Sequence, residues 1–490
     1  MARRLAIAAW LGFALATLFF YPLAAALDAN SYYLQWQRQD VAETISALAL
    51  LTILFGAAVF GLWQRSTRMA TVALLAVAAL PLGSFAAGVA RQLPWDDALR
   101  SAWESRAIRY PVPGAVLLAG VVAFIRFPQA CNRWLRRLLI LLSPISLVVV
   151  TAVAGSARLP PAVAAMDRVP RAAELQAAVC APVLALLFDE LSFSYLYDDG
   201  GSLRPEFPEI ARFASTATTY TAVVAPGGDT RNAVPSLLAA RHLRDVRIEG
   251  ADILELRDDD TLVPLDVTGS DGLFATARRL GLSPEVAGYY LSYCDLLGDV
   301  VDACRSLSFY NASTPHDRFS PLSPVLTTFI LWPRQFPFGL LKNPAFAMLQ
   351  RELVAQSTMF AGRPLAAAPP VFRLVHFSIP HLPFVFTAQG YDPPLDPLRT
   401  SPDADYVAQL GYVDRLVGEL LAPLRASGAY DEATIVLFAD HGFRYGGRER
   451  DPLRIPFIVK TAGQSAGNTI DMPEAGEQLL KRVVEGSCRL

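Results

Sequence analysis

The sequence predicts a bundle of transmembrane helices followed by an α/β domain with a mostly parallel sheet between helices. Hydrophobic residues make up 53% of the 490 residues and charged residues only 18%, which is too apolar for a soluble chain of this length. Apolar stretches of membrane length lie in the first third of the chain. Beyond residue 180, short apolar runs typical of strands alternate with helical stretches, the order expected of a sheet covered on both faces.

Five stretches in residues 1–155 are predicted to cross the membrane, which makes this part a five-helix transmembrane domain. A helix needs ~20 apolar residues to cross the ~30 Å hydrocarbon layer of a bilayer. The first stretch is too long for a removed signal peptide and lacks the small-residue cleavage pattern. The fourth is shorter than the others. The predicted spans are Leu5–Leu27, Thr44–Trp63, Ala70–Ala90, Val112–Phe127 and Leu138–Gly155.

Arginines in the connecting segments predict the orientation. The chain start and the links Gln64–Met69 and Pro128–Arg137 carry arginine without acids, whereas the links Asp28–Glu43 and Arg91–Pro111 mix acids with bases. The positive-inside bias places the N-terminus in the cytoplasm. An odd number of spans then puts everything after Gly155 outside, in the periplasm or on the outer face of the plasma membrane.

The predicted exported domain covers residues 181–490 and follows a linker at residues 156–180. The linker is rich in Pro, Ala and Arg and reads as a tether with room for one short helix. The domain alternates predicted strands with predicted helices. The strands are Ala181–Phe188, Thr218–Val224, Val371–Phe377, Ile435–Ala439 and Ile455–Lys460, and the helices are Pro208–Thr216, Ala233–Leu243 and Tyr406–Leu424.

Potential metal ligands follow two of these apolar strands. Asp189 and Glu190 follow the first, and Asp440 and His441 follow Ile435–Ala439. Carboxyl ends of parallel strands meet at one edge of a sheet, which is where open α/β sheets place their chemistry. Oxygen and imidazole ligands suit Zn²⁺ or Mn²⁺. Solvated acids at strand ends are the structural alternative.

Thr230 lies at the entry of the predicted helix Ala233–Leu243, behind the chain break Pro226-Gly227-Gly228. A hydroxyl at this place lies among unpaired backbone N–H groups, which favour an anion. The residue chemistry alone leaves two roles open for Thr230, a helix cap and a nucleophile.

Three of the five histidines lie at or near strand ends. His381, in a turn flanked by prolines, is a candidate functional residue. His376 lies within an apolar run, so a packed core histidine is the alternative to a substrate-binding one.

Several motifs taken together resemble the alkaline phosphatase superfamily, in the sulfatase-like branch that includes lipoteichoic acid synthases and lipid A phosphoethanolamine transferases. Five spans before an exported domain are also similar to those transferases. The motifs cover most of residues 181–460. They are Phe188-Asp189-Glu190, Thr230-Arg231-Asn232-Ala233-Val234-Pro235-Ser236-Leu237-Leu238, His381-Leu382-Pro383, Leu424-Arg425-Ala426-Ser427-Gly428, Ala439-Asp440-His441-Gly442 and Ile455-Pro456-Phe457.

The resemblance implies a metal centre with a covalent nucleophile. Asp189, Asp440 and His441 would bind one divalent metal ion, Zn²⁺ or Mn²⁺, and Thr230 would be both nucleophile and fourth ligand. The metal ion would lower the pKa of the threonine hydroxyl. His381 would bind the substrate or protonate the leaving oxygen.

Three further residues are assigned to the substrate side of the predicted site. Arg231 would pair with a non-bridging oxygen of the phosphoryl group, and a solvated surface arginine is the alternative. His376 and Glu190 are candidate substrate-binding residues.

The chain also departs from the family pattern. Formylglycine sulfatases carry cysteine where this chain has Thr230, which disfavours that chemistry. The Asp-x-x-x-His pair of a second zinc ion is not evident around His381, which indicates one metal ion. Leu238-Ala239-Ala240 stands where relatives often have Leu-Thr-Gly. These differences leave a non-catalytic domain as an alternative.

In residues 250–369 the family pattern fades. A disulfide between Cys294 and Cys304 is expected on the exported side. The apolar segment Pro321–Leu341 contains an uninterrupted part too short to span a bilayer. It is either an interfacial segment, which would hold the site near a lipid-borne substrate, or a core segment of the soluble domain.

The expected function is that of a membrane-anchored enzyme which moves a phosphoryl head group from a membrane lipid onto a cell-envelope lipid or glycan. A phosphodiesterase or sulfate-ester hydrolase is the first alternative, and an envelope-assembly or glycan-binding protein without activity is the second. A net charge of −2 gives no indication of a nucleic-acid partner. The sequence does not name donor or acceptor.

Overall fold

A computed structural model describes the chain in two compact units. Unit 1 comprises Met1–Pro161 and Ser313–Asn343, and unit 2 comprises Ala162–Ala312 and Pro344–Leu490. The described residues are all those outside 30–37, 66–121, 124, 142–143, 157–164, 169–178, 250–251, 308–319, 336–343, 366–367, 394–401, 445–446 and 490.

Three apolar helical stretches of unit 1 are long enough to cross a membrane, namely Ala2–Ala24, Gln39–Arg65 and Gln129–Gly155. They overlap the predicted first, second and fifth spans. The predicted span 70–90 and most of 112–127 lie outside the described residues. The helices of unit 1 are α1 (Ala2–Ala29), α3 (Arg38–Arg65), α8 (Pro128–Leu141), α9 (Pro144–Ser156) and α15 (Leu322–Gln335).

The predicted link Pro128–Arg137 is helical, and the candidate span starts at Gln129 rather than Leu138. A helix accommodates this basic stretch because its arginines are spaced for one face. Arg136, for example, lies over the ring of Trp63 at 4.8 Å from the ring centroid.

Helices α1 and α3 pack closely because glycines face each other at their crossing. A Cβ atom on Gly12 would lie 2.4 Å from the carbonyl oxygen of Thr52 and 2.6 Å from the backbone nitrogen of Gly56. Such contacts between small residues are typical of helix pairs in membranes. Helix α9 also packs on α1, and the hydroxyls of Thr17 and Ser146 lie 2.6 Å apart between them.

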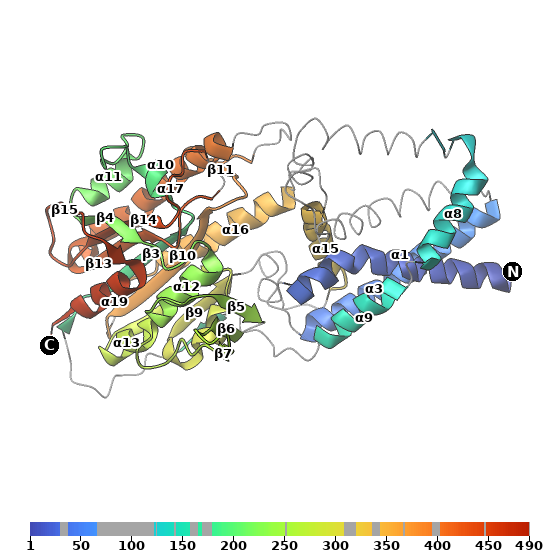
Figure 1. The fold of residues 1–490 in the computed structure, drawn as a ribbon, viewed down its shortest axis with the longest axis horizontal. Helices are drawn as coiled ribbons and strands as arrows, with labels where there is room; N and C mark the ends of the chain where they lie inside the picture. Colours follow the sequence, from blue (N-terminus) through green and yellow to red (C-terminus); the bar gives the residue numbers. More distant parts are fainter. Residues whose placement is uncertain are drawn as a thin grey trace. The chain divides into compact units, whose positions relative to one another are not determined.

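Unit 2 is built on a ten-stranded mixed sheet whose central strands are parallel (Figure 1). The pairs β9–β8, β8–β10, β10–β3 and β3–β13 are parallel, while β13–β14 and β14–β4 are antiparallel. The mostly parallel α/β sheet is therefore confirmed. In sheet order the strands are β1 (Ala165–Asp167), β9 (Ala303–Leu307), β8 (Ser283–Tyr289), β10 (Val371–Pro380), β3 (Val183–Asp189), β13 (Thr434–Ala439), β14 (Arg454–Lys460), β4 (Thr218–Val224) and β15 (Asn468–Ile470), with β16 (Glu474–Ala475) also on β4.

Helices cover both faces of this sheet. Figure 1 shows α12, α13 and α19 on one side and α11 and α17 on the other. The helices are α10 (Phe193–Leu196), α11 (Pro208–Ala214), α12 (Thr230–Ala239), α13 (Leu273–Arg279), α14 (Tyr293–Leu297), α16 (Pro344–Ala361), α17 (Pro402–Ser427), α18 (Ala429–Glu432) and α19 (Gly476–Gly486), with a short 3₁₀ turn at Gly298–Val300. The small sheets pair β5 (Val246–Glu249), β6 (Asp252–Leu256) and β7 (Leu262–Pro264), β11 (Phe386–Thr387) with β12 (Gly390–Tyr391), and β2 (Val179–Cys180) with β17 (Cys488–Arg489).

Two predicted boundaries were wrong. Helix α12 begins at Thr230 and ends at Ala239, four residues before the predicted end at Leu243, because Ala240 takes a left-handed conformation with φ 53°. In the linker, Ala165–Asp167 forms strand β1 and pairs with β9, whereas residues 157–164 and 169–178 lie outside the described residues, so the short helix expected in the linker stays a prediction.

Two disulfides cross-link unit 2. The expected bond between Cys294 and Cys304 is confirmed. A second bond joins Cys180 to Cys488, across 308 residues of sequence, and was not expected from the spacing of the cysteines. The bond links the two strands of the β2–β17 pair, in which Cys180 and Cys488 lie opposite each other.

Candidate metal centre and nucleophile

Two neighbouring parallel strands carry the acidic residues of the site. Strands β3 and β13 pair in register, with Ala439 opposite Phe188, so the next residues, Asp440 and Asp189, leave the sheet at the same level. All strand residues are buried on both sides, as their continuous apolar runs predict. The carboxylates therefore meet at the carboxyl edge of the sheet, as expected from the sequence.

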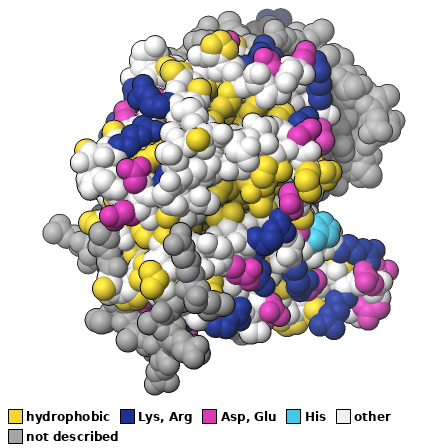
Figure 2. Space-filling model, turned by 90° about the vertical axis from the view of Figure 1, so that its left-hand side faces the viewer, with side chains coloured by type: hydrophobic (Ala, Val, Ile, Leu, Met, Phe, Trp, Pro, Cys, Tyr) yellow, Lys and Arg dark blue, Asp and Glu magenta, His cyan; other side chains and the backbone are white. Residues whose placement is uncertain are grey.

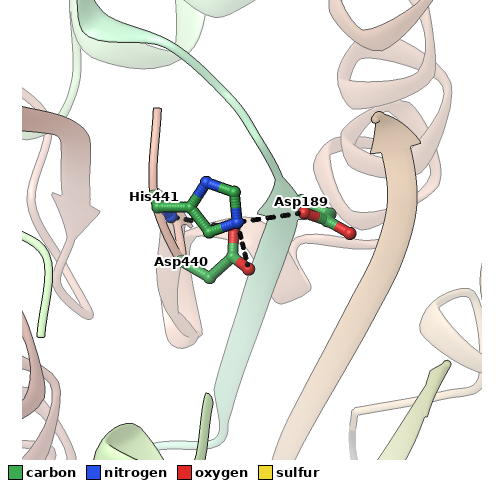
Figure 3. A group of neighbouring side chains, drawn as sticks. All are labelled: Asp189, Asp440 and His441. Carbon is green, nitrogen blue, oxygen red and sulfur yellow. Dashed lines mark hydrogen bonds and ion pairs between the residues drawn. The ribbon is translucent and has the colours of Figure 1, made fainter. Parts of the chain in front are cut away.

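Asp189, Asp440 and His441 form a fully buried cluster (Figure 3). The Nε2 atom of His441 lies 3.7 Å from Oδ1 of Asp189 and 3.5 Å from Oδ2 of Asp440. One ligand atom from each residue lies within 4.8 Å of the other two. This spacing leaves room for one ion between the three side chains.

Thr230 completes the cluster from helix α12. Its Oγ1 atom lies 3.3 Å from Oδ1 of Asp189 and 3.3 Å from Nε2 of His441, and the residue is 3% exposed. Asp229, rather than Thr230, caps the helix by accepting the backbone N–H of Asn232. Gly227 allows the close approach of the preceding turn, since a Cβ atom there would lie 2.7 Å from that of Asn232.

The protonation of His441 suits a metal ligand. Its Nδ1 atom lies 2.9 Å from the carbonyl oxygen of Gly442, which can only accept, so Nδ1 carries the proton. The lone pair of Nε2 then points toward the carboxylates and the Thr230 hydroxyl. A backbone carbonyl that fixes the tautomer in this way is the usual partner of a metal-binding histidine.

The charges of the cluster are strongly coupled. Burial raises the pKa of Asp189, and the negative charges of Asp440 and Glu190 raise it further. Burial also acts to raise the pKa of Asp440, but the positive charges that His441 and His376 carry when protonated, together with the hydrogen bond from the backbone N–H of Glu190, outweigh it and leave that pKa below its usual value. Two carboxylates at this distance repel each other unless a cation lies between them.

The residues present fit a divalent metal ion. Among the described residues, Oδ2 of Asp440 has no hydrogen-bond donor although it is buried. A buried carboxylate oxygen without a donor is costly, and a metal ion would satisfy it. Two carboxylates, a neutral imidazole and a hydroxyl form a donor set that suits Zn²⁺ or Mn²⁺.

Glu190 lies beside the cluster but is engaged elsewhere. Its Oε1 atom accepts Nε of Arg444 at 2.9 Å, and its backbone N–H donates to Oδ1 of Asp440 at 3.1 Å. The residue is buried with φ 63°, a left-handed conformation that turns the chain sharply after Asp189. The structure thus places Glu190 where it orients Asp440.

His376 is buried in strand β10, next to the cluster. Its Nδ1 atom lies 2.8 Å from the hydroxyl of Tyr293, and its Nε2 atom has no hydrogen-bond partner among the described residues. Burial lowers the pKa of His376 to about 4, so the ring is neutral at pH 7. The structure is compatible with both interpretations of this residue, a packed core histidine and a substrate ligand.

The other two predicted residues lie outside the buried cluster. His381 follows strand β10, and its backbone N–H donates to the carbonyl of Asp189 at 3.1 Å. Its ring is partly exposed, and Nδ1 lies 2.7 Å from the carbonyl oxygen of Leu382, which leaves Nε2 as the acceptor. Arg231 is not brought to the cluster, because its side chain is 45% exposed and lies near Asp229 and Asp245.

Sequence reasoning missed two side chains that hold the cluster. The hydroxyl of Tyr289, at the end of strand β8, donates to Oδ2 of Asp189. Arg444 binds Glu190 from the segment that follows His441. The position of Arg444 two residues after Gly442 was a usable signal. Tyr289 gave none, because Ser283–Tyr289 lacks a clear apolar run.

Comparison with protein families gives one match in the second half of the chain. Residues 306–479 match the family model described as Sulfatase, a region that includes His376, His381, Asp440 and His441. The search of curated proteins returned no match.

Solved structures with which the chain aligns include sulfatases and phosphonate monoester hydrolases. The phosphonate monoester hydrolase of Agrobacterium radiobacter is 15% identical, with 63% of this chain and 73% of that chain covered and a TM-score of 0.40. The PsFucS1 sulfatase from Pseudoalteromonas sp. is 15% identical, with 63% and 67% covered and a TM-score of 0.39. Ps i-CgsB in complex with k-i-k-neocarrahexaose is 13% identical, with 63% and 72% covered and a TM-score of 0.42.

These alignments are too weak to carry an argument of their own. The family match covers residues 306–479, which include Asp440 and His441 but neither Asp189 nor Thr230. This part of the chain is therefore similar to the family described as Sulfatase.

Proposed function

We propose that this protein is a membrane-anchored, metal-dependent enzyme in which Thr230 forms a covalent intermediate with a phosphoryl group taken from a membrane lipid. The observation that carries the proposal is the position of the Thr230 hydroxyl, buried and 3.3 Å from both Asp189 and His441. A threonine that only caps a helix has no need of these neighbours, and Asp229 already caps this helix.

The donor set would hold one Zn²⁺ or Mn²⁺ ion through Asp189, Asp440, His441 and Thr230. The bound ion would lower the pKa of the threonine hydroxyl and neutralise charge on the phosphoryl oxygens. Thr230 Oγ would then attack phosphorus as its proton leaves. The bond from phosphorus to the lipid alcohol breaks, and the leaving alcohol takes up one proton, which balances the proton given up by Thr230 and is delivered by Nε2 of His381.

In the second half of the reaction an acceptor hydroxyl attacks the phosphorus of the intermediate, in which Thr230 and the head group are both esterified to the phosphoryl group. The phosphorus–Oγ bond breaks and Thr230 regains its proton. Nε2 of His381 has its lone pair free to accept the proton of the incoming hydroxyl, because Nδ1 donates to Leu382. A lipid or glycan acceptor makes the enzyme a transferase, and water makes it a phosphodiesterase.

The first turn of α12 supports an anionic substrate. Thr230 and Arg231 occupy the first turn of a ten-residue helix, where backbone N–H groups lack helical partners and the helix dipole favours negative charge. This role uses the backbone of Arg231 rather than its exposed side chain.

Two features support an exported domain on an inner (plasma) membrane anchor. Three helical stretches are long and apolar enough to cross a membrane, and two disulfides cross-link unit 2. Disulfides persist in oxidising compartments such as the periplasm or the cell exterior.

Reporter fusions test the orientation. An alkaline phosphatase reporter fused after Gly155 should be active, because the positive-inside bias places that point outside, and one fused after Trp63 should be silent. The reverse pattern would contradict export and, with it, the envelope substrates.

A sulfate-ester hydrolase is the second candidate, favoured by the family match. The same centre would bind a sulfate ester, but the threonine at position 230 lacks the aldehyde chemistry of a formylglycine. Turnover of an aryl phosphodiester and of an aryl sulfate by the full-length protein separates the two. The proposal predicts faster turnover of the phosphodiester.

The proposal is tested with the full-length protein in proteoliposomes that contain head-group-labelled phospholipid. Thr230→Ala and Asp440→Ala should each reduce label transfer or release by about 10³-fold or more, and the double variant should be little worse than either single one. Ser236→Ala is the matched control, because it also removes a buried hydroxyl from helix α12. The Ser236 hydroxyl donates to the carbonyl of Asn232 and accepts the backbone N–H of Leu243. Activity retained in Thr230→Ala would contradict the covalent route.

Metal analysis separates an enzyme from a binding module with a retired site. The purified wild-type protein and Thr230→Ala should contain one divalent ion per chain, and Asp440→Ala should not. A wild-type protein that binds no Zn²⁺ or Mn²⁺ at neutral pH would favour the binding module.

A further inference from the structure

In the part of helix α15 whose side chains the structure describes, Leu322–Phe329, polar and small residues face inward and apolar residues face outward. Its buried residues are Ser323, Pro324, Thr327 and Thr328, whereas Leu322 and Leu326 are 67% and 52% exposed. Phe329 is 49% exposed on the same face. In a helix bathed by water, the opposite arrangement is expected, with the leucines inside.

The hydroxyls of Thr327 and Thr328 are hydrogen-bonded within α15. Thr327 donates to the carbonyl of Ser323 at 3.0 Å, and Thr328 donates to that of Pro324 at 2.7 Å. Small and hydroxyl-bearing side chains turned toward neighbouring helices are typical of helix packing within membranes.

The partners of α15 are the candidate membrane helices α1 and α3. Phe329 meets Phe19 of α1 edge-on, with ring centroids 5.3 Å apart. At the start of α15, Oε1 of the buried Glu43 accepts the backbone N–H of Ser320 at 2.8 Å. An acid at this place favours the helix by its dipole and holds the segment to α3.

Helix α3 likewise buries polar residues and exposes apolar ones. This similarity indicates what surrounds the exposed face of α15. On α3, Asp40, Glu43 and Thr44 are buried, while Ile53 is 66% exposed. Since α3 is long and apolar enough to cross a bilayer, its outward side chains have acyl chains as their natural surroundings. A helix packed against α3 with the same outward chemistry shares those surroundings.

We propose that α15 lies in the bilayer, with Leu322, Leu326 and Phe329 against lipid acyl chains. Its 14 residues make about 21 Å of helix, less than the ~30 Å needed to cross. It is therefore a partly inserted segment, and the chain enters and leaves the membrane on one side.

This insertion gives unit 2 a second attachment to the membrane. The chain of unit 2 stops at Ala312 and resumes at Pro344, and the segment between them belongs to unit 1. Strand β10, which carries His376 and ends beside His381, follows this segment in the chain. The inference uses the membrane anchoring proposed above but not the metal chemistry.

Site-directed fluorescence tests the proposal with the full-length protein in proteoliposomes. Cys131 is the one cysteine outside a disulfide, so a Cys131→Ser background leaves a single reactive thiol in each of Leu322→Cys and Leu326→Cys. A dye at either position should lose fluorescence to lipids with brominated acyl chains and keep it in aqueous iodide. Ile53→Cys is the membrane control, and Met472→Cys, on a residue 62% exposed in unit 2, is the aqueous control.

Two results would overturn the proposal. Quenching by iodide to the extent seen at Met472→Cys would place α15 in water, and resistance to both quenchers at both positions would mean that protein covers the face. If Ile53→Cys is quenched by lipid while Leu326→Cys is not, the anchoring stands and the insertion of α15 falls. If the dyes at Ile53→Cys and Leu326→Cys are both quenched only by iodide, the membrane anchoring and the insertion of α15 are both contradicted.

Discussion

The two units differ in the side chains that they expose. In unit 1, Thr17, Glu43 and Thr328 are at most 2% exposed while Leu50 and Ile53 are more than half exposed. In unit 2 the central strands bury every apolar residue they carry, and charged side chains of both signs are interspersed on the face seen in Figure 2. The exposed apolar side chains of unit 1 lie on helices that are long and apolar enough to cross a membrane, which agrees with the membrane anchoring proposed above.

Acidic side chains are buried in both units, and each of the three described next has a hydrogen-bond donor. Glu43 in unit 1 and Asp414 in unit 2 both accept backbone N–H groups at the start of a neighbouring helix. Glu285 in unit 2 pairs with the guanidinium of Arg373, which is 1% exposed, at 2.7 Å. In each case the acid is tolerated because it has donors, whichever solvent surrounds the unit.

The largest effect on stability should come from breaking the Arg373–Glu285 pair. Glu285→Ala leaves a buried guanidinium without its acid, which should lower the free energy of unfolding of unit 2 by about 3–5 kcal/mol. Pulse proteolysis in urea measures it. Asp299→Ala removes an exposed partner of Arg168 and should cost less than about 1 kcal/mol. Equal losses in both variants would contradict the burial argument.

A matched pair of leucines tests the contrast between the units directly. Leu186→Ala in strand β3 removes a fully buried side chain and should cost about 2–5 kcal/mol. Leu50→Ala on α3 removes a side chain that is 51% exposed and should change stability by no more than about 0.5 kcal/mol. In proteoliposomes, Leu50→Lys should nevertheless reduce membrane insertion, which carbonate extraction measures. Normal insertion of Leu50→Lys would contradict lipid around α3.

The smallest predicted effect is a pH dependence at Asp414. Burial raises its pKa from an ordinary value of 3.8 to about 6, although Glu209 and Ile210 donate backbone N–H groups to it. The stability it contributes is therefore fully present below pH 3.8 and is lost as the pH rises through 6.

Asp414→Asn, which does not titrate, reveals this loss. Between pH 4 and pH 7 the wild type should lose about 2 kcal/mol of unfolding free energy relative to the variant. Urea unfolding at the two pH values measures it, with the charges of Glu209 and Arg212 present in both proteins. A constant difference would contradict the raised pKa.

Local patterns were enough to predict the strands that carry the site. The apolar runs that end at Asp189 and Asp440 fix both strand identity and the residue at which each chain leaves the sheet. The turn before Thr230 was equally visible, because Pro226 and two glycines break the chain there. These features depend on residues within one element.

Features that depend on contacts between distant elements were not predictable. The Cys180–Cys488 bond and the Tyr289–Asp189 hydrogen bond join residues 308 and 100 positions apart. For Arg231 the sequence left two alternatives, a phosphoryl-binding and a solvated arginine, and the side chain is 45% exposed and lies near Asp229 and Asp245. A helical pattern in the sequence predicts which side chains share one face of the helix, but not which other element packs against that face.

The central claim is that Thr230, held by the cluster of Asp189, Asp440 and His441, becomes covalently modified during turnover. Full-length protein mixed with phospholipid, quenched in acid and digested should yield a peptide in which Thr230 carries the phosphoryl head group as a phosphodiester, as identified by mass spectrometry. The signal should be absent in Thr230→Ala and present in Ser236→Ala. Two results would contradict the account in an enzyme that turns over: an adduct that maps to Ser236 or another residue, or no adduct at all. Either would favour direct attack by water.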